Sequence, residues 1–87
     1  MHTIIPLEGD VSINQFPRIV HNTTIMGGKA CVVGTRITVG MILVHISEGA
    51  THDEILAEYP HLTKDDIVEV IRYAAWVVGA TEDLVVL

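Results

Sequence analysis

Residues 49–67, GATHDEILAEYPHLTKDDI, contain two helix starts, and the rest of the sequence is arranged around them. Thr51 and Glu54 have the spacing of a capping box, in which hydroxyl and carboxylate each accept a backbone N–H. Thr63 and Asp66 repeat the pattern in a weaker form, because aspartate is shorter than the usual glutamate. Pro60 ends the first of these helices, since the residue before a proline is displaced from the α region. The stretch therefore predicts a short helix, a turn and a longer helix, which is the helix-turn-helix outline.

The flanking sequence extends this outline to three helices, at about 39–48, 52–59 and 64–78. Thr38 is a candidate cap for the first helix, and Gly49 and Gly79 are candidate stops for the first and third. Apolar residues at helical spacing predict the faces of the first helix that pack on the core: Val39, Ile42, Leu43 and Ile46. Met41 and Val44 make its other side apolar, so we expect this helix to be buried nearly all round. The stripe expected for the third helix is Ile67, Val70, Ile71, Ala74 and Val78.

The first third of the chain is rich in β-forming residues and turn residues. Residues 18–21 and 30–33 are β-rich runs separated by asparagine, threonine and glycine, so residues 18–34 are expected to form a small hairpin. Residues 1–17 are expected to be an arm, with a short edge strand at 3–5. Residues 79–87 are expected to be a tail, of which residues 82–87 could add a strand to a neighbouring sheet. The predicted fold is one mainly α domain over residues 18–87, a three-helix unit of helix-turn-helix type with an N-terminal hairpin.

Composition predicts a small cytoplasmic protein that associates with itself. The chain has 87 residues, 49% of them hydrophobic, and so short a domain buries a low fraction of its surface alone. We therefore expect a homodimer, formed through the hairpin and the apolar end of the third helix. No apolar run approaches the ~18–20 residues of a membrane span, and the N-terminus does not resemble a signal peptide. Cys31 is the only cysteine, so an internal disulfide is excluded, consistent with a reducing compartment.

The charge distribution disfavours nucleic acid as the partner. The net charge is −6, and residues 45–87 hold nine carboxylates against Lys64 and Arg72. Non-specific nucleic-acid binding requires basic groups that neutralise phosphates. In a helix-turn-helix the DNA-reading positions would include Lys64 and Arg72, but Asp65 and Glu69 lie among them and would repel phosphate. A three-helix unit that contacts protein is the interpretation this pattern favours.

Other motifs give partner-binding candidates and little sign of chemistry. The glycines around Lys29 and Arg36 are compatible either with a hairpin turn and bend or with contacts to a partner or a phosphate. Tyr73 and Trp76 are either interface anchors or ordinary core aromatics. The five histidines lack the spacing of a helical zinc site, and no serine or cysteine has a recognisable nucleophile setting. We therefore expect no catalytic residues, no metal, no cofactor and no enzymatic activity.

Taken in order, these motifs resemble a widespread family of short prokaryotic proteins. The residues that carry the resemblance are Gly27-Gly28-Lys29, Val33-Gly34-Thr35-Arg36-Ile37, Gly49, Leu56, Tyr59-Pro60, Leu62, Asp66-Ile67 and Tyr73-Ala74-Ala75. The family is catalogued as a domain of unknown function, and many members are described as VapB-like antitoxins of PIN-domain ribonuclease toxins. The resemblance covers roughly residues 18–78. One departure is Ala30, where the family usually has proline after Gly-Gly-Lys.

The resemblance implies a homeodomain-like fold, often with an N-terminal β element that helps dimerisation. It also implies a non-enzymatic antitoxin that binds and neutralises a PIN-domain toxin. Lys29, Arg36, Tyr73 and Trp76 are the candidate contacts, and Lys29 or Arg36 is a candidate to cover the acidic metal site of the nuclease. The alternative is a dimeric DNA-binding regulator using Lys64 and Arg72, and the two roles coexist in antitoxins that repress their own operons. A purely structural dimeric module is the third possibility.

Overall fold

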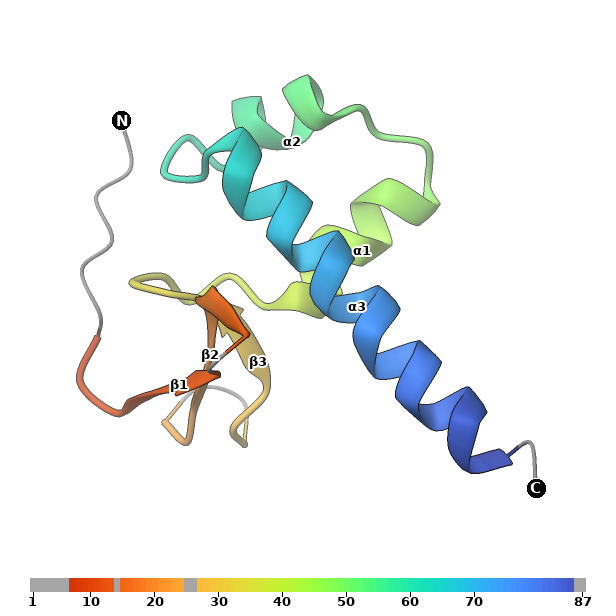
Figure 1. Cartoon of the computed structure of the whole chain (residues 1–87). Coiled ribbons are helices and arrows are strands. Elements are labelled where there is room, and N and C mark those ends of the chain that lie inside the picture. Colours follow the sequence, from red (N-terminus) through yellow and green to blue (C-terminus); the bar gives the residue numbers. More distant parts are fainter. Residues whose placement is uncertain (1–6, 14, 25–26, 86–87) are drawn as a thin grey trace.

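The computed structural model of the chain describes residues 7–13, 15–24 and 27–85. A three-stranded sheet comes first and three helices follow: β1 (Asp10–Ile13), β2 (Phe16–Asn22), β3 (Ala30–Val32), α1 (Val39–Ser47), α2 (His52–Glu58) and α3 (Lys64–Val85). Figure 1 shows α3 as the long diagonal helix, with the sheet on one side and α1 and α2 on the other. The C-terminal half of α3 projects beyond the rest of the molecule.

Both helix starts predicted from residues 49–67 are present. Thr51 donates its backbone N–H to Glu54 over 2.9 Å, and the N–H of Glu54 donates to the Thr51 hydroxyl over 3.1 Å. Thr63 and Asp66 make the same reciprocal pair over 2.9 and 3.2 Å, so the shorter aspartate still closes the second box. α2 ends at Glu58, two residues before Pro60. The local sequence signals therefore fix these helix boundaries.

The predicted end of the third helix at Gly79 is wrong. α3 continues through this glycine to Val85, so most of the expected tail at 79–87 is helix. A glycine inside a helix costs only about 1 kcal/mol relative to alanine, which a long helix already in progress tolerates. Gly49 does behave as predicted, because it follows α1 with a φ of 91°, a conformation that favours glycine.

The expected hairpin is present as part of a larger sheet. β2 and β3 pair antiparallel, with Val20 opposite Cys31, and β1 pairs antiparallel on the other edge of β2. Residues 10–13, expected to belong to an arm, thus form a strand. The register shifts between Ser12 and Ile13, near Pro17, which lacks the N–H that a regular ladder needs. The edge strand expected at residues 3–5 lies outside the described residues.

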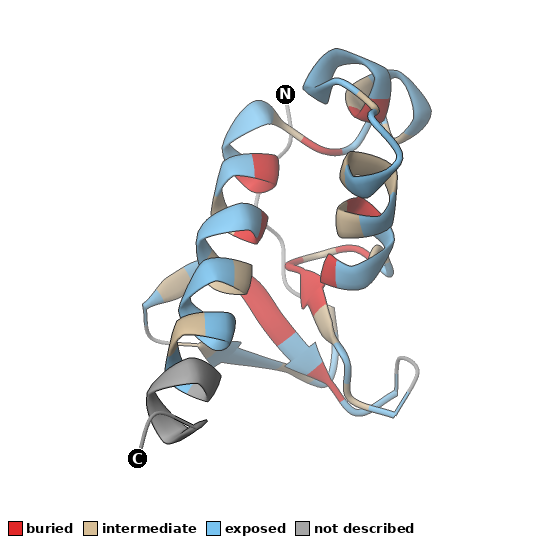
Figure 2. Cartoon of the chain, turned by 90° about the vertical axis from the view of Figure 1, so that its right-hand side faces the viewer, coloured by how far each residue is buried: buried red, intermediate tan, exposed pale blue. Residues whose placement is uncertain are grey.

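The core lies where α3 crosses β2 and α1. Figure 2 shows the buried residues on the inner sides of α1 and α3 and along the strands. The largest fully buried apolar side chains are Ile19, Val32, Ile42, Ile55, Ile67 and Val70. Expectations at the edge of this core were wrong: Met41 and Val44 leave α1 exposed on its outer side, and Ile71 and Val78 of the predicted α3 stripe are also exposed. Within the described residues, no element buries those faces.

Candidate protein-binding surface

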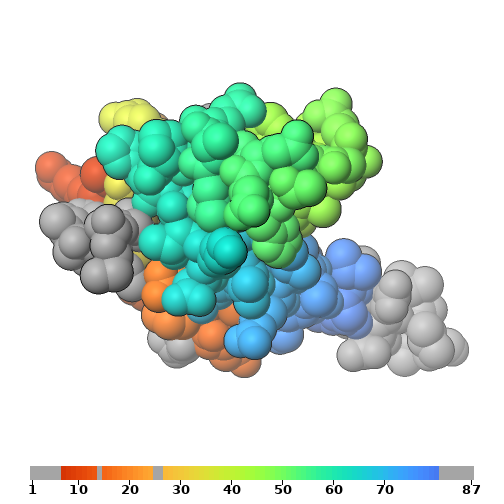
Figure 3. All heavy atoms as spheres, turned by 90° about the horizontal axis from the view of Figure 1, so that it is seen from above, coloured from red at the N-terminus to blue at the C-terminus, as the bar shows by residue number. Residues whose placement is uncertain are grey.

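The short helix α2 and the first turn of α3 create an acidic end of the helical unit. We define this acidic end by four exposed carboxylates: Asp53, Glu54, Glu58 and Asp65. Seen from above, the segment of α2 and the start of α3 form the surface facing the viewer (Figure 3). The side chains of Asp53 and Asp65 are 85% and 81% exposed, and the nearest ammonium, that of Lys64, lies 3.9 Å from Asp53. Asp53, Glu54 and Asp65 lie in the first turns of their helices, where the helix dipole stabilises a carboxylate, whereas Glu58 is the last residue of α2.

Asp66 does not belong to that surface, because its side chain is fully buried. Its Oδ1 accepts a hydrogen bond from Nη1 of Arg18 over 3.0 Å, and its Oδ2 accepts the N–H of Thr63. The backbone N–H of Arg18 donates to Glu69, one turn further along α3. Asp66 therefore joins β2 to the start of α3 and is neutralised inside the molecule. In the sequence, Asp66 is one of the nine carboxylates of the acidic half, and nothing relates it to Arg18, because 48 residues separate the two.

Two of the predicted partner contacts, Lys29 and Tyr73, line the same groove. This α1–α3 groove has a volume of about 580 Å³ and is lined by His21, Lys29, Ala30, Thr38, Val39, Gly40, Met41, Val44 and Tyr73. Its α1 wall is apolar, and the basic side chains His21 and Lys29 lie at its strand end. The ring of His21 also hydrogen-bonds the carbonyl of Gly28 through Nδ1, at 2.8 Å. The groove thus combines an apolar wall with a basic border.

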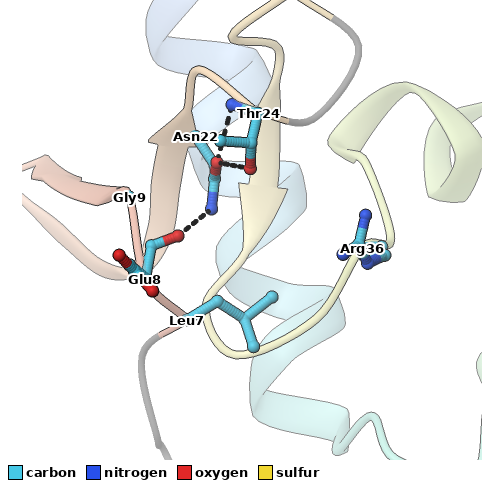
Figure 4. Close-up of a pocket in the computed structure, with 6 residues that line it drawn as sticks. All are labelled: Leu7, Glu8, Gly9, Asn22, Thr24 and Arg36. Carbon is cyan, nitrogen blue, oxygen red and sulfur yellow. Dashed lines mark hydrogen bonds between the residues drawn. The ribbon is translucent and has the colours of Figure 1, made fainter.

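Arg36 lies in a different pocket from Lys29. This pocket is a hollow between the residues that precede β1 and the loop that precedes α1. Leu7, Glu8, Gly9, Asn22 and Thr24 are the other lining residues of this hollow, whose volume is about 430 Å³ (Figure 4).

Asn22 is the buried centre of this hollow. Its Nδ2 donates to the Glu8 carbonyl and to Asp10, and its Oδ1 accepts from the N–H and hydroxyl of Thr24. The amide is thus satisfied within the chain, and Arg36 is the exposed cation at the rim. The structure does not bring Arg36 and Lys29 into one pocket.

Tyr73 and Trp76 form an aromatic cluster with Phe16 at the start of β2. The ring centroid of Phe16 lies 5.5 Å from that of Tyr73 and 5.7 Å from that of Trp76. Tyr73 is half-buried, whereas Trp76 is 49% exposed. Tyr73 thus packs as a core aromatic, whereas Trp76 keeps about half of its surface exposed. Phe16 was missed because a single aromatic before Pro17 carries no periodic signal.

Lys64 and Arg72, the candidate DNA contacts, are both exposed on α3. They are eight residues apart, about 12 Å along the helix axis. Asp65 is exposed between them, and Lys64 faces Asp53 of α2. The two cations are therefore placed among carboxylates and do not form a basic stripe.

Two titratable groups are shifted by their surroundings. Hydrogen bonds from the backbone and hydroxyl of Thr51 lower the pKa of Glu54. Burial, and then the charge of Asp10, raise the pKa of the Cys31 thiol, which makes it a poor nucleophile at neutral pH. Within the described part of the chain, no three His, Cys, Asp or Glu side chains gather as a metal site. Over the same residues, no helix combines the length and apolarity of a membrane span.

Comparison with known proteins identifies the family. The model of DUF433, described as a protein of unknown function, matches residues 19–74. The chain belongs to the DUF433 family. The matched region runs from β2 to the middle of α3, and so includes the groove residues, the acidic end and Asp66, while Arg18 directly precedes it.

One solved structure of a DUF433 protein, from Anabaena variabilis, is similar to this chain. The TM-score is 0.67 at 27% sequence identity, and the match covers 80% of this chain and 69% of the other. No curated protein matches the chain. The DUF433 fold is therefore shared between the two proteins, and the family description assigns no activity to either.

Proposed function

We propose that this DUF433 protein is a non-enzymatic antitoxin that binds and neutralises a PIN-domain ribonuclease. The observation that carries the proposal is the acidic end, where four carboxylates are exposed beside Lys64, and where Arg18 lies 3.8 Å from Asp65. A ribonuclease needs a basic surface to hold RNA, so this end is complementary to it. Such complementarity accelerates encounter and selects partners. The VapB-like resemblance of the motifs around Lys29, Arg36 and Tyr59-Pro60 supports the choice of nuclease.

We also infer that α1, α2 and α3 form a homeodomain-like helix-turn-helix that contacts protein. The short α2, the turn through Pro60 and the long α3 support this classification. The exposed side chain of Asp65 lies in the first turn of α3, the part that enters the major groove in DNA-binding members of this class. A carboxylate there is repelled by phosphate and attracted to the arginines and lysines of an RNA-binding surface.

The exposed cations have a separate role in this proposal. Arg36 is exposed at the rim of its hollow, and Lys29 is exposed at the end of the α1–α3 groove. Either one covers the acidic metal site of the nuclease, while Tyr73 and Trp76 supply apolar contact area next to it. Because the two cations lie in different pockets, single substitutions distinguish them: Arg36→Ala or Lys29→Ala weakens inhibition, and the other leaves it unchanged.

The experiment is co-expression with the PIN-domain protein encoded beside this one, followed by co-purification and an RNase assay. The expected result is a complex that lacks RNase activity, with an association rate that falls as salt rises. Asp53→Lys combined with Asp65→Lys should slow association at least tenfold. Glu48→Lys is the control, because Glu48 is an exposed carboxylate that follows α1 and belongs neither to the acidic end nor to the lining of either pocket. Lack of binding to the neighbouring PIN protein, or equal effects of both variants, would contradict the proposal.

The second candidate, a dimeric DNA-binding regulator, is favoured by one observation. Lys29 and Arg36 are exposed in the part of the chain that precedes α1, away from the carboxylates of α2. A dimer presenting these cations would bind its own promoter with the acidic ends turned away. A gel shift on that promoter at low and moderate salt tests this. Loss of the shift in Lys29→Ala and Arg36→Ala would support that mode, and its loss in Lys64→Ala and Arg72→Ala would support binding through α3.

A further inference from the structure

We propose that the α1–α3 groove holds an amphipathic helix of the nuclease, which crosses α1 at Gly40 and carries carboxylates at its end next to Lys29. This inference rests on the antitoxin proposal and deepens it, because it names the element of the partner that binds. It also selects Lys29, and not Arg36, as the cation that faces the acidic residues of the nuclease. Lys29 borders the groove, whereas Arg36 lines a different pocket.

The first step is Gly40, which lines the groove from the first turn of α1. Its backbone is helical, and beyond the backbone of α1 itself a Cβ added there would meet only the Thr38 hydroxyl, at an ordinary distance of 3.8 Å. The described chain therefore does not require a glycine here, although glycine weakens a helix relative to alanine. The other use of a glycine is to let a second backbone come close. Gly40 thus marks a place where a partner approaches α1.

The second step is the chemistry of the groove. Met41 and Val44 form its exposed α1 wall, with Val44 56% exposed, and Tyr73 of α3 lines the same groove. The lining residues include no carboxylate, and Lys29 and His21 lie at the strand end, although the whole chain has a net charge of −6. The groove therefore has the opposite sign of charge from the acidic end. A partner segment with an apolar face and carboxylates at one end is complementary to it.

The third step is that the bound segment must satisfy its own backbone hydrogen bonds. Ala30 brings β3 to the groove, but the outer edge of this strand is occupied by the segment before α1. The N–H of Val32 donates to the Ile37 carbonyl over 2.9 Å, and Cys31 pairs with Thr38. An extended peptide therefore cannot pair with these residues of β3. A helix satisfies its backbone internally, docks in an apolar groove through one face, and can approach α1 at the near end of the usual ~8–10 Å between helix axes when the crossing residue is glycine.

The test measures binding of the full chain to the PIN-domain protein encoded beside it, with RNase inhibition recorded in parallel. Gly40→Leu and Val44→Glu obstruct the groove, and each is expected to raise the dissociation constant of the complex by about tenfold or more. Val11→Glu is the matched control for the new charge, because Val11 is 58% exposed on β1 and does not line the groove. This control should bind as the wild type does, and all variants should keep the far-UV circular dichroism of the wild type.

Further measurements separate a role in binding from a role in folding. Gly40→Ala should raise the thermal midpoint of the free chain, because alanine favours a helix, and should still weaken the complex, by a smaller factor than Gly40→Leu. Benzoylphenylalanine incorporated at Met41 should form a photocrosslink to a helix of the nuclease that has an apolar face. Lys29→Ala should weaken RNase inhibition, and Arg36→Ala should leave it unchanged.

The outcomes distinguish this inference from the proposal on which it rests. If the wild type does not bind the PIN-domain protein, the antitoxin proposal is wrong and this inference is wrong with it. If the wild type binds and inhibits but tolerates both Gly40→Leu and Val44→Glu, the antitoxin proposal stands and the groove is not the contact. A crosslink from Met41 to a second copy of this chain, or to a strand or loop of the nuclease, would also overturn the assignment of a helix. Inhibition that depends on Arg36 and not on Lys29 would overturn the choice of cation.

Discussion

Replacing Asp66 by alanine is expected to destabilise the fold far more than replacing its neighbour Asp65. The Asp66 side chain is fully buried and accepts two hydrogen bonds, one from Arg18 and one from the backbone of Thr63. The Asp65 carboxylate is 81% exposed and lies 3.8 Å from the same guanidinium. The two residues thus form a matched pair: adjacent in sequence, identical in charge and opposite in burial.

The expected loss of stability depends on whether each substitution leaves a buried charge without its partner. Removing one partner of a buried ion pair costs ~3–5 kcal/mol, because the other charge is left uncompensated. The Arg18 side chain keeps 25% of its surface exposed, so water recovers part of that loss. Adding the lost helix cap, typically ~1 kcal/mol, we expect about 3 kcal/mol for Asp66→Ala. Exposed pairs are worth ~0–1 kcal/mol, which sets the expectation for Asp65→Ala.

The assay is urea unfolding at one fixed protein concentration, followed by circular dichroism and by fluorescence of the single tryptophan, Trp76. Thermal unfolding is a second readout, since 1 kcal/mol shifts the midpoint of a domain this size by ~4–8 °C. A double-mutant cycle with Arg18→Met isolates the pair. The double variant should lose about 1–2 kcal/mol less stability than the sum of the two single losses. Equal losses for Asp65→Ala and Asp66→Ala, both below about 1 kcal/mol, would refute the view that this contact joins β2 to α3.

Three further changes test other features of the structure. Gly79→Ala should raise stability by up to about 1 kcal/mol in thermal unfolding, because α3 is continuous there. Beyond the backbone of α3 itself, no atom of the described residues lies within 4 Å of the added Cβ. A loss of stability would indicate that the helix ends at this glycine. The capping contact of Glu54 should make stability fall in acid: its lowered pKa means that the contribution is present above the unfolded value near 4.5 and is lost as pH drops through the folded value. Glu54→Gln should flatten that part of the pH profile, and an unchanged profile would contradict the cap's role. Cys31 should react slowly with a thiol reagent in the native state and rapidly in urea, because burial raises its pKa. For the same reason, the stability of the fold should decline as pH rises above the ordinary thiol pKa of 9.0. Equal labelling rates in both states would contradict this burial.

The sequence by itself determined the features that depend on neighbouring residues. The capping boxes at Thr51 and Thr63, the end of α2 before Pro60 and the end of α1 at Gly49 each involve groups within four residues of one another. Such groups are close in space in any chain that begins to form the helix. The pairing of β2 with β3 was predictable for a related reason, since turn residues separate two β-rich runs.

Only the tertiary structure decided which side chains meet across long separations. In the sequence, Arg18 and Asp66 are two unrelated charges, and they meet only because β2 packs against α3. The burial of Asp66 makes it an internal contact and not a surface charge. Phe16 joins Tyr73 and Trp76 in the same way. The continuation of α3 through Gly79, and the exposure of Val44 and Val78, depend on which surfaces the rest of the chain covers, because burial is a property of the packed molecule.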